Sequence, residues 1–191
     1  MRKQIVFVAF AALTFFLGYE NVQAKIITPK NASKVDMETM GVAFGSFIEI
    51  ENNLGLDNPF VTYYIRKKGD EGKPQALTSK KGPFALSLEP GVYEIYDWIL
   101  ESKANFLGTW SGREKSKDRY EFEVKPKHVT YIGQIVSDVY YVESSKGNLV
   151  PRNHPWVSDQ KNTDIPLFSK SHPMFFEMGL IIAAKDKFRW C

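Results

Sequence analysis

Residues 84–95, with the sequence FALSLEPGVYEI, contain the pattern of two strands joined by a tight turn. Apolar side chains occupy every second position on both sides of the turn, which is typical of strands with one buried face. Pro90 restricts φ at the first corner of the turn, and Gly91 accepts a positive φ at the second corner. The stretch therefore predicts two neighbouring strands joined by a type II turn that runs from Glu89 to Val92.

The same two-residue period extends outward through most of the chain and predicts further strands. It is clearest where Tyr120, Phe122 and Val124 alternate with charged residues. Residues 129–142 are apolar on both faces, as expected for one central strand or for two strands divided near Ser137. The remaining strands are predicted at residues 42–50, 61–65 and 179–185.

The strand predicted at residues 92–100 changes the parity of its apolar positions half way along. Tyr93 and Trp98, one in each half, would fall on opposite faces of a regular strand. A β-bulge inserts one extra residue and so reverses the facing of everything that follows it. We therefore expect a bulge near Tyr96 and Asp97, which would bring both halves to the same face.

Polar stretches that contain glycine separate the strands and predict loops, the longest at residues 67–82 and 108–118. Many short strands with few helices predict an all-β fold, because their apolar faces must be covered by a second sheet. We expect an antiparallel β-sandwich of about seven or eight strands, transthyretin-like or immunoglobulin-like, with a closed barrel as the alternative. Residues 40–191 would form this single domain, preceded by an arm at residues 25–39.

One short C-terminal helix is expected at residues 163–171. Thr163 or Asp164 can cap its first turn, and Pro166 falls within that turn. Pro173 ends the helical pattern, because proline cannot continue a helix.

Residues 1–24 have the three zones of a secretory signal peptide. Arg2 and Lys3 supply the positive charge, and residues 5–18 form an apolar stretch that is short for a membrane span. Small or short side chains precede a predicted cut between Ala24 and Lys25. The alternative is an uncleaved membrane anchor. No cysteine stands directly after Leu17 and Gly18, at the end of the apolar stretch, to accept a lipid, so we expect an exported protein without a lipid anchor, in the periplasm or the outer envelope.

Cleavage there would leave 23 basic and 21 acidic residues, because Arg2, Lys3 and Glu20 are removed from totals of 25 and 22. A nearly balanced charge argues against a nucleic-acid partner, which would require a basic excess. Cys191 is the only cysteine, so the domain cannot form an internal disulfide and must be stabilised by packing. We expect no transmembrane segment after signal removal.

A resemblance supports the predicted fold. Residues 86–95 contain the pattern L-x-P-G-x-Y-x-I, which resembles the turn between neighbouring strands in transthyretin-like, or prealbumin-like, sandwich domains. Two further pieces resemble a group of exported bacterial proteins of unknown function with such a fold: residues 122–126 running into residues 130–133, and residues 164–173. The resemblance spans residues 40–185 and implies a fold but no chemistry. Lys127 departs from it, because that group often has glycine after the equivalent of Pro126.

No residue pattern in the chain specifies a catalytic, metal or cofactor site. His128, His154 and His172 are far apart in sequence and lack partners at metal-ligand spacing. His128 would open a strand and His172 would end the helix, both at the surface. Ser158 and Lys161 match the S-x-x-K motif, but the companion motifs of those enzymes are missing. We therefore expect no catalytic residue, no metal and no cofactor.

Recognition is expected instead in the loop at residues 104–119, because long loops on a rigid sandwich commonly bind partners. Phe106 and Trp110 offer flat apolar rings there, and Arg113 and Lys115 offer positive charge. Alternatively, these rings pack back against the sheet. Other aromatic residues at predicted strand ends or in loops are Trp98, Trp156, Phe175 and Phe176.

Together these features predict a non-enzymatic protein of the cell envelope that binds a protein or glycan partner. Two alternatives remain. A carbohydrate-binding or envelope-polymer module would require exposed aromatic rings that converge on one patch. A small hydrolase with a dispersed active site would require a serine, a histidine and an acid within hydrogen-bond reach.

Overall fold

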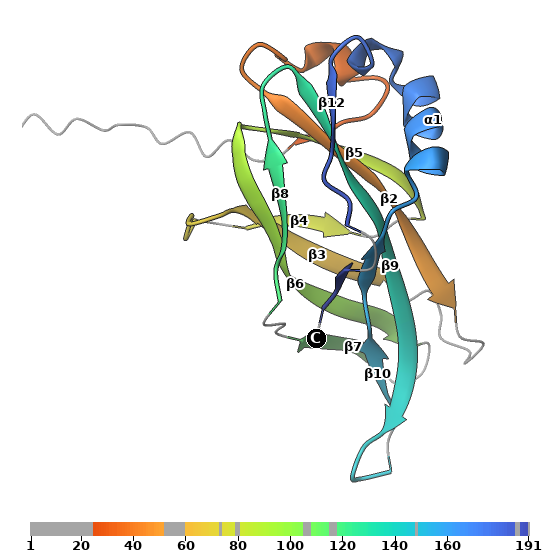
Figure 1. Ribbon diagram of the computed structural model, residues 1–191. Helices are drawn as coiled ribbons and strands as arrows, with labels where there is room; N and C mark the ends of the chain where they lie inside the picture. The colour runs from red at the N-terminus through yellow and green to blue at the C-terminus, as the bar shows by residue number, and fades with distance from the viewer. Residues whose placement is uncertain are drawn as a thin grey trace, which may run out of the picture.

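Two β-sheets face each other in the computed structural model, which describes residues 25–51, 60–72, 74–78, 81–104, 108–114, 118–147, 149–185 and 188–190 (Figure 1). Within these residues, one sheet has eight strands and the other has five. In Figure 1, β3 and β4 of the smaller sheet run across the direction of β2 and β9 of the larger one. The predicted two-layered β architecture is therefore confirmed.

The larger sheet is built around β9 (His128–Glu143), the longest strand described. β9 has β2 (Gly41–Glu51) on one side and β12, β11 and β10 in succession on the other. The other strands of this sheet are β1 (Lys25–Ile26), β5 (Gly82–Leu88), β10 (Leu149–Asn153), β11 (Trp156–Ser158), β12 (Gly179–Ile182) and β13 (Phe188–Arg189).

The smaller sheet is built around β6 (Gly91–Ala104), which pairs with β3 on one side. On the other side its first half pairs with β8 and its second half with β7. The other strands of this sheet are β3 (Phe60–Lys67), β4 (Gln75–Thr78), β7 (Gly108–Glu114) and β8 (Tyr120–Val124).

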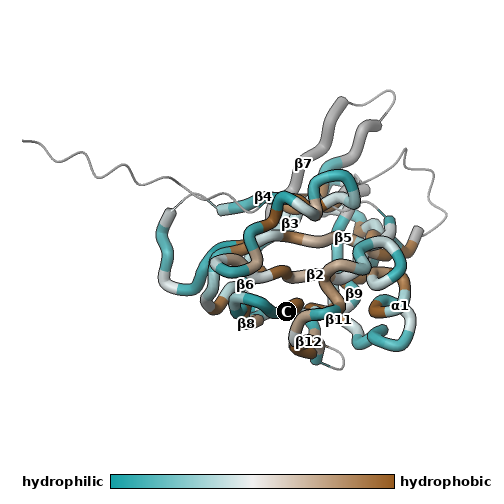
Figure 2. Tube along the Cα trace, turned by 90° about the horizontal axis from the view of Figure 1, so that it is seen from above, coloured by the Kyte–Doolittle hydropathy of each residue, from teal (hydrophilic) through white to brown (hydrophobic). Residues whose placement is uncertain are grey.

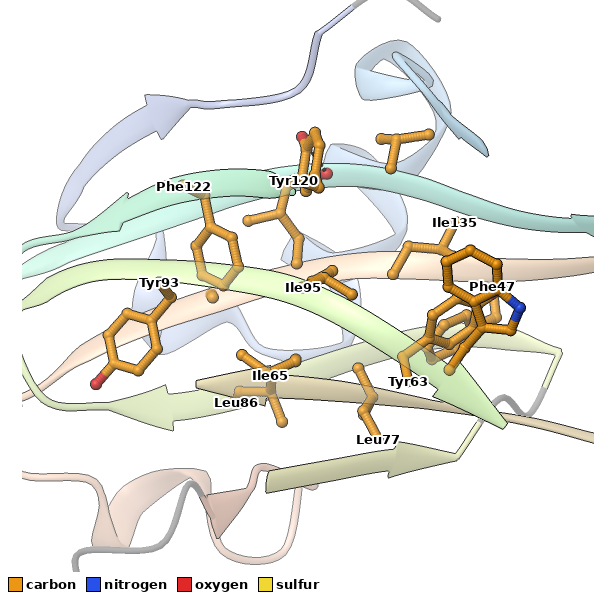
Figure 3. Close-up of a cluster of buried hydrophobic side chains, with 14 of the residues drawn as sticks. Phe47, Tyr63, Ile65, Leu77, Leu86, Tyr93, Ile95, Tyr120, Phe122 and Ile135 are labelled. Atoms are coloured by element: carbon orange, nitrogen blue, oxygen red, sulfur yellow. Dashed lines mark hydrogen bonds between the residues drawn. The ribbon is translucent and has the colours of Figure 1, made fainter. Parts of the chain in front are cut away.

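A large core fills the space between the sheets, as Figure 3 shows. Tyr63, Ile95 and Phe122 point inward from the smaller sheet, towards Phe47 and Ile135 of the larger one. Figure 2 shows the same arrangement, with hydrophobic stretches in the strands of the two layers and hydrophilic turns at the periphery. Phe122 and the other alternating apolar residues of β8 are buried, as their pattern predicts.

A second core lies on the outer face of the larger sheet, under helix α1 (Lys161–Ser171). Phe168 of α1 stacks on Phe44 of β2, with ring centroids 4.1 Å apart. The 3-10 helices η1 (Ala32–Lys34) and η2 (Pro173–Phe175) complete this layer. The expected N-terminal arm packs here too, because Ile27 and Met37 are buried in this core. No helix among the described residues has the length and apolarity to cross a membrane.

The larger sheet is mixed, so the prediction of a purely antiparallel sandwich is wrong. Both β2 and β12 run parallel to β9, while β10 and β11 run antiparallel to it. The predicted number of strands is also too low for the described residues. β4 and β7 form within stretches that were expected to be loops, because backbone pairing with β3 and β6 stabilises even polar segments.

The predicted β-bulge is present. Tyr64 of β3 pairs with Asp97 and Ile65 with Ile95, so Tyr96 is the extra residue of β6. As a result, Ile95 and Trp98 are both buried in the core. The bulge reconciles the two halves of the strand, as the change in parity required.

Gly91 has the predicted positive φ, but the predicted type II turn is not formed. Its φ is 152°, far from the value of about +80° that a type II turn requires. Gly91 is instead the first residue of β6 and pairs with Val124 of β8. A Cβ atom at Gly91 would lie 2.5 Å from Cε of Lys67, a flexible side chain that could move aside.

The predicted helix is confirmed, but it begins earlier than expected. α1 starts at Lys161, and Gln160 occupies the N-cap position without a side-chain capping bond. Asp159 instead accepts a hydrogen bond from the backbone N–H of Lys161 at 3.0 Å. Thr163 and Asp164 therefore lie inside the helix, and Asp164 points into the protein, where it is buried.

Candidate functional site

The candidate site is the part of the outer face of the larger sheet that α1 does not cover. In Figure 1, α1 lies against one end of this sheet, and β9 and β10 continue beyond it. We call this region the open face. It is formed by Ile48, Ile50, Asp138, Tyr140, Val142, Val150, Arg152, His154 and Trp156.

Strand register places these side chains together. β10 and β11 form one continuous ladder along β9, with Arg152 opposite Tyr140 and Trp156 opposite Val136. Between them, the backbone N–H of His154 donates to the carbonyl of Asp138 at 2.9 Å. Because side chains alternate between the faces of a sheet, the even-numbered residues of these strands share the outer face.

Burial confirms this alternation. Val139, Asn153 and Val157, with odd numbers, are buried on the inner side of the sheet. On the outer side, Tyr140 is 38% exposed and Ile50, on the neighbouring strand β2, is 39% exposed. The open face therefore presents apolar and aromatic side chains to solvent, which is typical of an interaction site when such residues are contiguous.

Aromatic rings and a pair of opposite charges give the open face its chemistry. The rings of His154 and Trp156 meet edge to face, with centroids 6.4 Å apart. Asp138, opposite His154, lies between Trp156 and Tyr140 along the ladder, and Arg152 lies directly opposite Tyr140. Flat rings suit stacking on apolar surfaces such as those of sugar rings, and the carboxylate and guanidinium groups can bind hydroxyl groups.

A buried polar network attaches α1 at the border of the open face. One carboxylate oxygen of Asp164 accepts hydrogen bonds from Ser46 Oγ at 2.8 Å and from the Tyr131 hydroxyl at 2.9 Å. The Tyr131 hydroxyl also accepts the backbone N–H of Gln160 at 3.0 Å. Burial, and then the hydrogen bond to Asp164, raise the pKa of Tyr131, so the hydroxyl remains a donor. α1 is thereby fixed just beyond β11, which carries Trp156.

A second polar group lies beneath the open face, on the inner side of the sheet. The hydroxyls of Tyr63 and Ser137 are 2.5 Å apart, and both residues are fully buried. Burial is the main cause of a raised pKa at Tyr63, and the charge of Glu49 adds to it. The nearby amide of Asn153 partly offsets this rise in the pKa of Tyr63. Both polar atoms of this amide are buried, and neither forms a hydrogen bond of good geometry with a described residue.

The structure describes only part of the loop site predicted from the sequence. The backbones of Trp110 and Arg113 lie in strand β7, opposite Ser102 and Ile99, so this segment is a strand and not the expected loop. Phe106 and Lys115 lie outside the described residues, as do the side chains of Trp110 and Arg113.

The other predicted aromatic candidates have different locations. Trp98 and Phe175 are buried, so they belong to the two cores and cannot contact a partner. Phe176 is half-buried and packs against the core under α1. Trp156 is half-buried on the open face, and it is the candidate that the structure places beside another partly exposed ring, that of His154.

Sequence reasoning missed Tyr140, Arg152 and His154 as binding residues. Tyr140 is part of the long apolar stretch of β9, where nothing distinguishes exposed from buried positions. The alternation of Arg152, His154 and Trp156 with buried Asn153 and Val157 was the available signal, but Pro155 interrupts it.

The surface position expected for His172 is wrong. Its side chain is only 7% exposed and stacks between Phe168 and Phe175, at centroid distances of 4.7 and 6.0 Å. Its Nδ1 atom contacts Ser171 Oγ at 2.9 Å, while Nε2 has no hydrogen-bond partner among the described residues. Burial therefore lowers the pKa of His172.

Within the described residues, the contacts of Ser171 and Ser46 do not form a catalytic triad. Ser171 meets His172, but its hydroxyl also donates to the carbonyls of Leu167 and Phe168, and no carboxylate bonds to the ring. Ser46 meets Asp164 without a histidine. No group of three or more potential metal ligands occurs in the part of the chain that the structure describes.

Comparisons with known proteins yield no relative. No protein-family model matches the chain, and searches of curated proteins and of solved structures find no match. The open face is therefore characterised by its own geometry.

Proposed function

We propose that this protein is an exported, non-enzymatic β-sandwich of the cell envelope that binds a glycan through the open face. Its fold would be transthyretin-like, as the L-x-P-G-x-Y-x-I pattern at residues 86–95 suggests. Export is supported by the signal-like residues 1–24, which precede β1 directly.

One observation carries the proposal. Tyr140, His154 and Trp156 are aromatic residues gathered on one partly solvent-exposed surface, together with the charged Asp138 and Arg152. Aromatic rings with polar edges suit sugars, which have apolar faces and hydroxyl-bearing rims. A carbohydrate module requires this convergence.

A protein partner is the second candidate, and the aliphatic residues favour it. Ile50 and Val142 are 39% and 36% exposed on the same face. Tyrosine, tryptophan and arginine are also the residues that most often dominate the energetics of protein interfaces. An assay with purified polysaccharides, in which no partner protein is present, separates the two candidates.

The proposal is tested by co-sedimentation of the purified mature protein with peptidoglycan sacculi, chitin and β-glucan. We expect binding to at least one of these polymers. Tyr140→Ala and Trp156→Ala should each weaken it about tenfold, which corresponds to about 1.4 kcal/mol, within the range for aromatic contacts. Leu180→Ala is the matched control, because Leu180 is 44% exposed but lies on β12, away from the open face.

Two results would contradict glycan binding through this face. One is the absence of binding to all three polymers. The other is an equal loss of binding in the Leu180 control and the two aromatic variants. Denaturation curves of each variant show whether it is folded, because Trp156 is half-buried and its removal also affects packing.

A further inference from the structure

The two outer rings of the open face are too far apart for one sugar. Trp156 lies opposite Val136, and Tyr140 lies four residues further along β9. At about 3.3 Å per residue, the two positions are separated by ~13 Å along the strand. This separation exceeds the size of a single pyranose ring, so a ligand that contacts both rings must be a chain of linked sugars.

The open face is longer than it is wide. Across the strands it consists only of β2, β9 and the β10–β11 ladder, which corresponds to a width of about 10 Å between the outer strands. Along β9, its side chains extend from Trp156 at the border of α1 to Val142 and Val150 near the end of the hairpin. A linear ligand that follows β9 therefore makes the most contacts.

The charges of the face favour a neutral ligand. Its described side chains include one acidic residue, Asp138, and one basic residue, Arg152. The face therefore has no net charge to attract an anionic chain, which would require a basic excess. Asp138 lies between the levels of the two outer rings and Arg152 lies opposite Tyr140, so both can bind hydroxyl groups of a sugar chain that contacts the two rings.

The rings are held in place before any ligand binds. Along the open face β9 pairs with the β10–β11 ladder on one side, and up to Val139 it also pairs with β2 on the other. The buried contact of Ser137 with Tyr63 also ties this part of β9 to the opposite sheet. A preformed arrangement lowers the entropic cost of binding a long, flexible chain.

From these observations we infer that the open face binds an extended, neutral oligosaccharide of at least three linked sugars, lying along β9 between Trp156 and Tyr140. This inference rests on the proposed function and specifies its ligand class. An acidic glycan and a single sugar are the occupants that it excludes.

The inference is tested by calorimetric titration with three series of oligosaccharides, each from one to six sugars. Two are neutral, derived from chitin and from β-glucan, and one is anionic, derived from polygalacturonate. In at least one neutral series, we expect affinity to rise at least tenfold between the disaccharide and the tetrasaccharide. The anionic series should bind more weakly, and affinity for the neutral chains should change less than twofold between 50 and 500 mM salt.

The variants give a sharper criterion. Trp156→Ala and Tyr140→Ala should each lower the affinity for the hexasaccharide until it approaches the affinity for the disaccharide. In at least one of the two variants, the affinity for the disaccharide itself should change much less. Leu180→Ala should bind all lengths as the unmodified protein does. Arg152→Gln keeps hydrogen-bond donors but removes the positive charge. We expect this variant to bind the tetrasaccharide more weakly, with a smaller effect on how that affinity depends on salt.

The outcomes separate this inference from the proposed function. Affinity that is the same for all lengths, or stronger for the anionic series, would overturn the inference but leave glycan binding intact. A failure of every oligosaccharide and of every polymer to bind would overturn both.

Discussion

At the scale of single residues, Lys127 is the clearest case of local strain. It joins β8 to β9 and is the one described non-glycine residue with a positive φ, at 59°. A side chain in this left-handed region costs roughly 1–2 kcal/mol, because Cβ approaches the neighbouring carbonyl. The backbone N–H of Lys127 donates to the carbonyl of Met37 at 3.0 Å, and its ammonium pairs with Glu38. These contacts hold the turn against the N-terminal segment.

We predict that Lys127→Gly stabilises the protein by about 1 kcal/mol, because glycine removes the steric cost of the left-handed conformation. The ion pair that is lost is exposed and contributes little. Urea denaturation would measure the change. Lys127→Ala is the control, since it removes the same ion pair but keeps Cβ, and it should not stabilise. Equal effects of the two substitutions would show that backbone strain is not the cause.

At the scale of elements, the attachment of α1 depends on a buried histidine. His172 caps the end of α1 and stacks on Phe168, which in turn stacks on Phe44 of the sheet. Burial lowers the pKa of His172 below its ordinary value of 6.5, and the hydrogen bond to the carbonyl of Phe168 opposes this only in part. The neutral imidazole is therefore the form that the folded protein accommodates.

We predict that the free energy of unfolding decreases as the pH is lowered from 7 to 5. The unfolded chain binds a proton at His172 from about pH 6.5 downward, whereas the folded chain binds it only at lower pH. The slope is at most about 1.4 kcal/mol per pH unit, the value for one proton. His172→Phe, which keeps an aromatic ring in the stack, should flatten this dependence. An unchanged slope in His172→Phe would contradict the prediction.

The elements that sequence predicts well are those whose two faces differ. The alternation of Tyr120, Phe122 and Val124 and the parity change at Tyr96 follow directly from which side chains must be buried. β10 was not predicted; it contains Pro151, which is tolerated where a strand pairs on one side only, and among the described strands β10 pairs with β9 alone. The parallel pairing of β2 with β9 was also missed, since alternation along one strand does not reveal its neighbours.

The same limit explains how much of the open face could be predicted. Trp156 was a candidate because it is an aromatic residue at a predicted strand end or in a loop. Tyr140 was not, because its exposure depends on where α1 ends over the sheet, which is a property of the tertiary fold. The loop at residues 104–119 had the composition of a binding site, but no pattern in it predicts the pairing of β7 with β6.

At the scale of the whole molecule, the protein has three layers, the two sheets and the helical layer of α1, η1 and η2, and they contribute differently to stability and to the exposed surface. The core between the sheets provides stability without a disulfide, as the single cysteine requires. The layer formed by α1, η1 and η2 covers one part of the larger sheet and leaves the other part exposed. Binding is therefore proposed at the boundary of this layer, where a rigid sheet meets solvent.

The chain's first described strand gives the predicted export step a structural consequence. β1 begins at Lys25, the residue after the expected cut, and pairs with Ser87 and Leu86 of β5. Next to it, the backbone N–H of Ile27 donates to the carbonyl of Ala85 at 2.8 Å, and Ile27 is buried. Cleavage after Ala24 would keep all of these contacts, whereas cleavage a few residues later would remove an edge strand and a core residue.

We therefore predict that the mature protein begins at Lys25. Expression of the full chain in a Gram-negative bacterium, followed by fractionation and intact-mass measurement, would identify the amino terminus. Ala24→Pro should block processing, because proline next to the cut disturbs the extended conformation that the peptidase requires, while Lys30→Pro, beyond the cut, should be processed normally. A purified envelope protein that retains Met1 would instead support the alternative of an uncleaved anchor, and an amino terminus after Ile27 would contradict a role for β1 in the mature fold.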